Sequence, residues 1–131
     1  MQKFAILCVD DEKMILSSLK AQLKEKFGNT YSYETAENAY EALEVIDELV
    51  EKNVFIVVIV SDWLMPGIKG DEFLINVHKK YPHIVKIMLT GQADANAIER
   101  SKKEANLFHC IMKPWTEKEL IDTINSALKK F

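Results

Sequence analysis

Residues 54–62, Val-Phe-Ile-Val-Val-Ile-Val-Ser-Asp, decide the fold class of this chain. An unbroken apolar run rich in β-branched residues is typical of a strand that is covered on both faces, as the strands of parallel sheets are. The run passes directly into Ser61 and Asp62, so a carboxylate follows the last apolar residue. We therefore expect a central buried strand that presents Asp62 at its carboxyl end.

Apolar stretches and helical patterns alternate on both sides of this strand. The predicted helices begin near residue 12, after Asn38, near residue 73, near residue 94 and after Thr116. Such an alternation is typical of βαβ units and predicts an α/β fold with a parallel sheet of five strands and with five helices. The other expected strands cover residues 4–9, 31–35 (a short edge strand), 84–89 and about 107–112.

The predicted helices differ in how strongly the sequence specifies them. Asn38 with Glu41, and Thr116 with Glu119, have the spacing of a capping box at a helix start. The segment 94–105 carries few apolar residues, all small except one isoleucine. We expect this helix to be the least firmly held.

Composition limits the function classes. With 131 residues and 48% hydrophobic content, the chain is expected to form a single domain over residues 1–131. Its 17 basic and 20 acidic residues give a net charge of −3, and no basic run exceeds a pair such as Lys102-Lys103, which argues against direct nucleic-acid binding. No apolar run approaches the roughly 20 residues that span a membrane, and the start lacks a cleavable signal pattern, so we expect a cytoplasmic protein. Cys8 and Cys110 lie in apolar segments and are expected to be buried, reduced thiols.

Polar residues follow four of the five predicted strands. The strands end in Asp10-Asp11, Asp62, Thr90 and Lys113. The carboxyl ends of parallel strands share one edge, where open sheets bind ligands, so these side chains are expected to converge. Singly, each has an ordinary structural explanation as a cap, a turn residue or a solvated lysine, but together they are hard to explain so. Clustered carboxylates repel one another unless a cation joins them, and all-oxygen ligands suit Mg²⁺.

Four segments stand out around the predicted strand ends: Val9-Asp10-Asp11; Ser61-Asp62-Trp63-Leu64-Met65-Pro66-Gly67 followed by Gly70; Leu89-Thr90-Gly91; and Lys113-Pro114-Trp115. On these segments the sequence resembles the receiver domains of bacterial response regulators, over residues 3–130. The resemblance implies a flavodoxin-like, doubly wound sheet with strand order 2-1-3-4-5, and a bond between Lys113 and Pro114 that is often cis in the family.

This resemblance implies a chemistry. In similar receivers the aspartate that matches Asp62 accepts a phosphoryl group from a sensor histidine kinase or phosphotransfer protein, and the residues matching Thr90 and Lys113 contact the phosphoryl oxygens. Such a transfer needs an exposed carboxylate nucleophile, a divalent ion and fixed donors. The implied Mg²⁺ ligands are Asp11, Asp62 and the backbone carbonyl of Leu64, with Asp10 acting mainly through a metal-bound water.

The resemblance also implies how a signal leaves the domain. A receiver is a switch and not a dedicated enzyme, with at most self-catalysed phosphorylation and slow autodephosphorylation. Its output face would be the helix at 94–105 with the last strand and last helix, acting on an output domain of a longer regulator, on an effector protein, or in a homodimer formed on phosphorylation. Many receivers have Tyr or Phe three residues before the lysine, where this chain has Cys110. Whether Cys110, Phe108 or His109 serves that position stays open.

Two alternative functions are compatible with these residues. A receiver-like interaction module that no longer takes phosphate is the main alternative, although all the acidic and basic site residues are present. A phosphohydrolase with an aspartyl intermediate is a second alternative. Such enzymes usually have an acidic residue two positions after the nucleophile, where this chain has Leu64, and the sequence has no glycine-rich phosphate loop. His78 and His83 are expected to lie in solvent.

Overall fold

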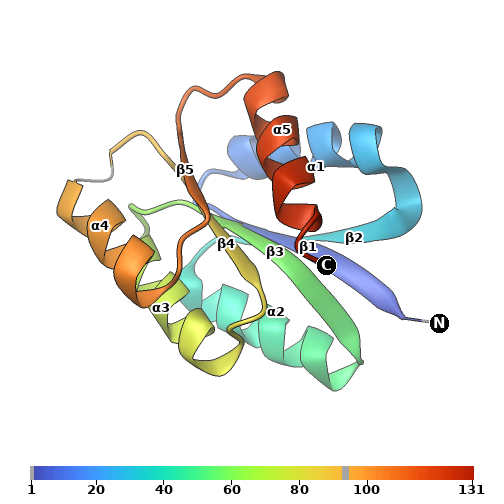
Figure 1. The fold of residues 1–131 in the computed structure, drawn as a ribbon, viewed down its shortest axis with the longest axis horizontal. Helices are drawn as coiled ribbons and strands as arrows, with labels where there is room; N and C mark the ends of the chain where they lie inside the picture. The colour runs from blue at the N-terminus through green and yellow to red at the C-terminus, as the bar shows by residue number, and fades with distance from the viewer. Residues whose placement is uncertain (1, 93–94) are drawn as a thin grey trace.

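The computed structural model describes residues 2–92 and 95–131. Strands and helices alternate along the chain (Figure 1), as the sequence pattern predicts. A short 3₁₀ helix at Gly28–Thr30 precedes the second strand. The elements are β1 Lys3–Val9, α1 Lys13–Phe27, β2 Tyr31–Ala36, α2 Ala39–Glu51, β3 Val54–Ser61, α3 Gly70–Lys80, β4 Val85–Thr90, α4 Ala95–Glu104, β5 His109–Met112 and α5 Glu117–Leu128.

The five strands form one sheet in the order β2-β1-β3-β4-β5. Every neighbouring pair is parallel. The predicted flavodoxin-like order is therefore confirmed. From β1 the chain adds β2 on one side and then β3 on the other, so the order reverses between β1 and β3. Ligands of open parallel sheets bind at this point, outside the carboxyl ends of the strands.

Helices cover both faces of the sheet and leave the strands between two cores. Helices α2, α3 and α4 lie on one side, and α1 and α5 lie on the other (Figure 1). Residues that alternate along β1 contribute to opposite cores: Ala5 and Leu7 pack toward α2 and α3, and Ile6 and Cys8 pack toward α1 and α5. The sheet is thus a rigid platform for the residues at its edge.

The two helix starts with a predicted capping box are both capped by side chains. Asn38 Oδ1 accepts the backbone N–H of Glu41 at 2.9 Å, and Glu41 Oε2 accepts the N–H of Glu37 at 3.3 Å. Thr116 Oγ1 accepts the N–H of Glu119 at 3.1 Å. The first box is therefore one residue longer than the expected form, because Glu41 reaches past the cap to the preceding residue.

Three expectations need correction. The third helix begins at Gly70, before the first apolar residue of its pattern. The last strand begins at His109, because the N–H of Leu107 still bonds to the Ser101 carbonyl at the end of α4. Cys110 is half-buried, whereas Cys8 is buried as expected. The predicted helix start at residue 94 lies outside the described residues.

None of the helices in the described ranges is long and apolar enough to cross a membrane.

Candidate functional site

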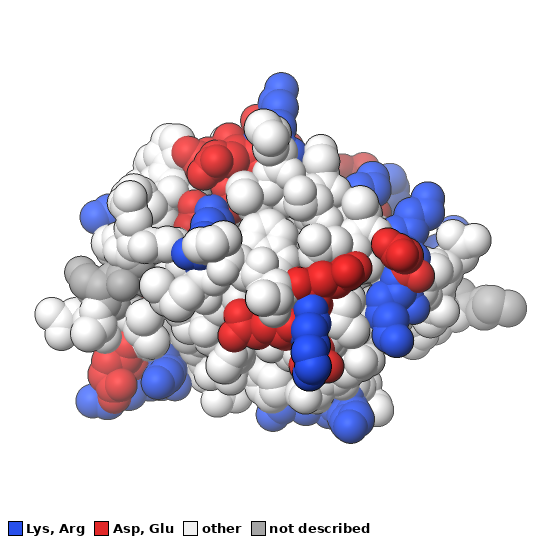
Figure 2. Space-filling model, turned by 90° about the horizontal axis from the view of Figure 1, so that it is seen from above, with Lys and Arg blue, Asp and Glu red and all other residues white. Residues whose placement is uncertain are grey.

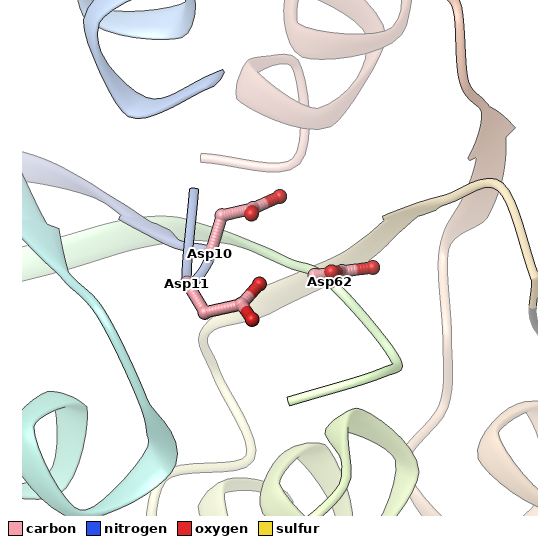
Figure 3. A group of neighbouring side chains, drawn as sticks. All are labelled: Asp10, Asp11 and Asp62. Atoms are coloured by element: carbon pink, nitrogen blue, oxygen red, sulfur yellow. The ribbon is translucent and has the colours of Figure 1, made fainter. Parts of the chain in front are cut away.

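Three aspartates meet at the point where the strand order reverses. Asp10 and Asp11 follow β1, and Asp62 follows β3 (Figure 3). Val9 pairs with Ser61 in the register, and the N–H of Asp62 donates to the Val9 carbonyl at 2.9 Å. One carboxylate oxygen from each aspartate lies within 4.8 Å of the others. The predicted convergence of these three side chains is thus present.

Lys113 reaches these carboxylates from the end of β5. Its Nζ lies 2.7 Å from Asp10 Oδ2 and 3.4 Å from Asp62 Oδ2. The backbone N–H of Lys113 donates to the carbonyl of Thr90, which is the last residue of β4, at 3.1 Å. The Lys113–Pro114 bond is cis. The four predicted strand ends therefore come together at one edge of the sheet.

The buried carboxylates are already hydrogen-bonded. Asp10 is 1% exposed, and its Oδ1 accepts the N–H of Glu12 at 2.9 Å while its Oδ2 accepts from Lys113. Asp62 is 6% exposed, and its Oδ1 accepts the N–H of Trp63 at 2.8 Å. Asp11 is exposed. Both oxygens of Asp10 therefore accept short hydrogen bonds. Asp62 has one such bond, at Oδ1, and its Oδ2 lies 3.4 Å from Lys113 Nζ, whereas Asp11 is open to solvent.

Burial and charge oppose one another in this cluster. Burial raises the pKa of Asp10, and the hydrogen bonds from Lys113 and Glu12 partly offset this rise. Desolvation lowers the pKa of Lys113, but the hydrogen bond with Asp10 and the charge of Asp62 outweigh it and leave the pKa raised. One ammonium beside three carboxylates does not balance the charge. The donor set is all oxygen and fits a hard divalent cation such as Mg²⁺.

Asp11 and Asp62 line an open pocket of about 260 Å³. Leu64, 44% exposed, forms part of its wall, and Thr90 Oγ1 accepts the N–H of Gln92 at 3.3 Å. Glu12 also lines this pocket. The sequence pattern placed it at a helix start and did not identify it as a site residue. The lining residues are Asp11, Glu12, Asp62, Leu64, Thr90, Gly91, Gln92 and Lys113.

Gly70 packs against the backbone of Asp62 and Trp63. Its N–H donates to the Trp63 carbonyl at 2.7 Å. A Cβ on Gly70 would lie 2.1 Å from the Asp62 carbonyl oxygen and 2.7 Å from the Trp63 Cα. A glycine is needed at this position because the two backbones approach closely.

The three candidates for the position that is Tyr or Phe in many similar receivers have different surroundings. Cys110 is half-buried and packs against the core beneath α2 and α3. Phe108 packs against the opposite core, and Lys130 Nζ lies 5.2 Å from the centroid of its ring. His109 is exposed. Cys110 is therefore the one of the three that lies on the α2–α3 side.

The surface charge is mixed on the face seen in Figure 2. Groups of Asp and Glu side chains lie there near scattered Lys and Arg side chains, and other residues make up most of the face.

The model of the response regulator receiver domain family matches residues 6–125. The chain belongs to this family. Receiver domains are signalling domains of two-component systems; phosphorylation is inherent to them, and they bind Mg²⁺ at an acidic pocket. The predicted family is therefore confirmed, together with an aspartate cluster suited to a metal.

Individual receiver domains are similar over nearly the whole chain. A CheY-like receiver domain protein from Methanospirillum hungatei is 33% identical, with a TM-score of 0.85 over 99% of this chain and 96% of that one. The beryllofluoride-activated NtrC4 receiver domain dimer is 31% identical, with a TM-score of 0.82 over 96% of this chain and 97% of that one.

A longer curated relative is the hydrogenase transcriptional regulatory protein HoxA of Cupriavidus necator. It is 36% identical over 95% of this chain. The chain spans 24% of the length of that regulator, and 24% of a second HoxA from Bradyrhizobium diazoefficiens. The receiver match thus concerns one segment of such regulators.

Proposed function

We propose that this receiver domain is a Mg²⁺-dependent switch that accepts a phosphoryl group on Asp62. One observation carries the proposal: Lys113 Nζ lies 3.4 Å from Asp62 Oδ2, in a pocket that Asp11 and Thr90 also line. A nucleophilic carboxylate, a second carboxylate for a metal and two fixed donors are what phosphoryl acceptance needs.

Asp11, Asp62 and the backbone carbonyl of Leu64 would hold the metal. When bound, Mg²⁺ offsets the negative charge that gathers in phosphoryl transfer. Asp10 contributes its charge without a direct bond to the metal, because Glu12 and Lys113 already occupy its oxygens. This division agrees with the burial of Asp10 and the exposure of Asp11.

The transfer forms one bond and breaks one. A carboxylate oxygen of Asp62 attacks the phosphorus of a phosphohistidine, the new O–P bond forms, and the P–N bond breaks so that the electron pair returns to the histidine nitrogen. Lys113 and Thr90 then donate to the phosphoryl oxygens. The donor is a sensor histidine kinase or a phosphotransfer protein in the cytoplasm. Slow attack of water on the acyl phosphate resets the switch.

The phosphoryl group changes which contacts Thr90 and Lys113 make. Both are drawn toward the new oxygens, which pulls the loop between β4 and α4 and shifts the face formed by α4, β5 and α5. An output domain or effector protein would read this face, and the domain itself would act as the N-terminal part of a longer regulator. The dimer of the activated NtrC4 receiver supports homodimer formation as one outcome.

Binding of a phosphoryl mimic tests the proposal. Mg²⁺ and then beryllofluoride are added to the Trp115→Phe protein, in which Trp63 is the remaining tryptophan, and fluorescence is recorded. We expect a saturable change with Mg²⁺ and a second change with beryllofluoride, and Asp62→Asn should lose the second. If neither addition perturbs Trp63, the phosphate-independent interaction module is favoured instead.

A further inference from the structure

Trp63, the residue after Asp62, is fixed on several sides. Its backbone N–H donates to Asp62 Oδ1 at 2.8 Å, and its carbonyl accepts from Gly70 at 2.7 Å. The Lys69 ammonium lies 5.0 Å from the centre of its ring. Its indole N–H donates to Asp71 Oδ1, in the first turn of α3, at 3.2 Å. The rotamer of Trp63 and the donor to Asp62 thus belong to one fixed unit.

The second oxygen of Asp71 faces α4. Arg100 Nη1 lies 3.3 Å from Asp71 Oδ2, and Arg100 Nη2 lies 2.7 Å from Glu72 Oε2. The Asp71 side chain is only 13% exposed, which limits competition from water. The Asp71 carboxylate therefore connects α4 with the acceptor segment, by which we mean Asp62 and Trp63. Helix α4 supplies none of the residues that line the pocket of Asp62.

Helix α4 has little other anchoring. Its buried residues are Ala97 and Ser101, both small, and the partly buried Ile98 packs against the core on the α2–α3 side. The Ser101 hydroxyl has no hydrogen-bond partner among the described residues. Figure 1 places α4 beside α3 at the edge of the molecule. Because α4 buries little apolar surface, the ion pairs of Arg100 with α3 contribute to where α4 lies.

We propose that Asp71 is a positioning residue for Asp62, and that Arg100 couples this position to the placement of α4. Asp71 holds Trp63, and Trp63 holds one oxygen of the Asp62 carboxylate. Any displacement of α4 that withdraws Arg100 therefore loosens the acceptor segment, and any reorganisation of Asp62 acts back on α4, because such coupling is reciprocal. This route is separate from the loop after Thr90. It rests on the proposed function to the extent that Asp62 is the acceptor.

Four substitutions separate the contacts. Arg100→Gln removes the guanidinium from α4. Asp71→Leu removes the bridge, whereas Asp71→Asn keeps an oxygen for the indole and removes the charge pair. Glu104→Gln is the matched control, because Glu104 pairs with Arg100 within α4, at 3.1 Å, and does not reach α3.

The readout is the ¹⁹F spectrum of protein labelled with 5-fluorotryptophan, with the Trp63 resonance assigned from Trp115→Phe. We expect Arg100→Gln and Asp71→Leu to shift or broaden the Trp63 resonance before any metal is added, and to weaken Mg²⁺ binding at least about twofold. Asp71→Asn should weaken Mg²⁺ binding but leave the Trp63 resonance closer to its original position. Glu104→Gln should change neither. In the Asp71→Leu background, Arg100→Gln should have no further effect.

A metal-free Trp63 resonance that is unchanged in Arg100→Gln and Asp71→Leu would overturn the inference. So would equal effects of Arg100→Gln and Glu104→Gln, since the contact with α3 would then not matter. Beryllofluoride distinguishes this failure from failure of the proposed function. If it still moves Trp63 in the wild type, the switch stands without this coupling; if it does not, the proposed function fails, and the metal-free spectra still decide the role of Asp71 and Arg100.

Discussion

The Nζ of Lys86 lies 2.8 Å from Nδ1 of His78, between β4 and α3. Lys86 is 1% exposed and also contacts the Pro82 carbonyl at 3.3 Å. Burial lowers the pKa of Lys86 from 10.5 to about 8, and burial together with the Lys86 charge lowers the pKa of His78. His78 is therefore half-buried and partnered, contrary to the sequence expectation, whereas His83 is exposed as expected.

This pair predicts a pH-dependent stability. The folded-state pKa of Lys86, about 8, lies below its ordinary 10.5. Between these values the unfolded chain binds more protons, so this residue makes the free energy of unfolding rise with pH, by roughly 3 kcal/mol in total. Urea unfolding at several pH values should show this rise in the wild type relative to Lys86→Met. A difference between the two proteins that does not change with pH would contradict the assignment.

Gly70→Ala should damage both stability and the acceptor segment. The added Cβ meets the Asp62 carbonyl oxygen at 2.1 Å, so backbone must move, and we expect a loss of about 2–4 kcal/mol in the free energy of unfolding. Gly28→Ala is the control. It has open space and a φ of +62°, and should lose only about 1 kcal/mol. Equal losses in the two variants would show that close approach is not what Gly70 provides.

Ser101→Ala should stabilise the protein. The buried hydroxyl lacks a partner among the described residues, and its removal together with the better helix propensity of alanine should add about 1 kcal/mol to the free energy of unfolding. The urea midpoint measures this. A lower midpoint in Ser101→Ala would mean that the hydroxyl is hydrogen-bonded in solution.

Lys113→Met should have opposite effects on metal and phosphoryl binding. Loss of a positive charge 3.4 Å from Asp62 favours a cation, so Mg²⁺ affinity should rise roughly tenfold. Beryllofluoride binding should weaken, because one of its donors is gone. Titrations followed by Trp63 fluorescence measure both affinities. Weaker Mg²⁺ binding in Lys113→Met would contradict the electrostatic account.

The strand ends were predictable from sequence because their signal is local. Each apolar run stops at a polar residue, and the parallel arrangement then brings Asp10, Asp62 and Lys113 together without further information. The two helix caps were predictable for the same reason. The roles of individual site residues, read from the family resemblance, stay predictions for the experiments described.

Contacts between helices were not predictable in this way. Arg100 is exposed and lies 29 residues from Asp71, and no periodic pattern relates them. Lys86 occupies a strand position where period alone gives no sign that α3 will cover it. The prediction that α4 is weakly held used its apolar residues alone. It did not include the ion pairs of Arg100 with α3. Such contacts depend on how elements pack, and only the folded arrangement reveals them.

Intact mass after incubation with a small phosphodonor tests the central claim most directly. The wild type and Asp62→Asn are compared with and without Mg²⁺. The account predicts one phosphoryl adduct on the wild type that requires Mg²⁺ and is absent from Asp62→Asn. An adduct of the same yield on Asp62→Asn, or no Mg²⁺-dependent adduct on the wild type, would contradict it.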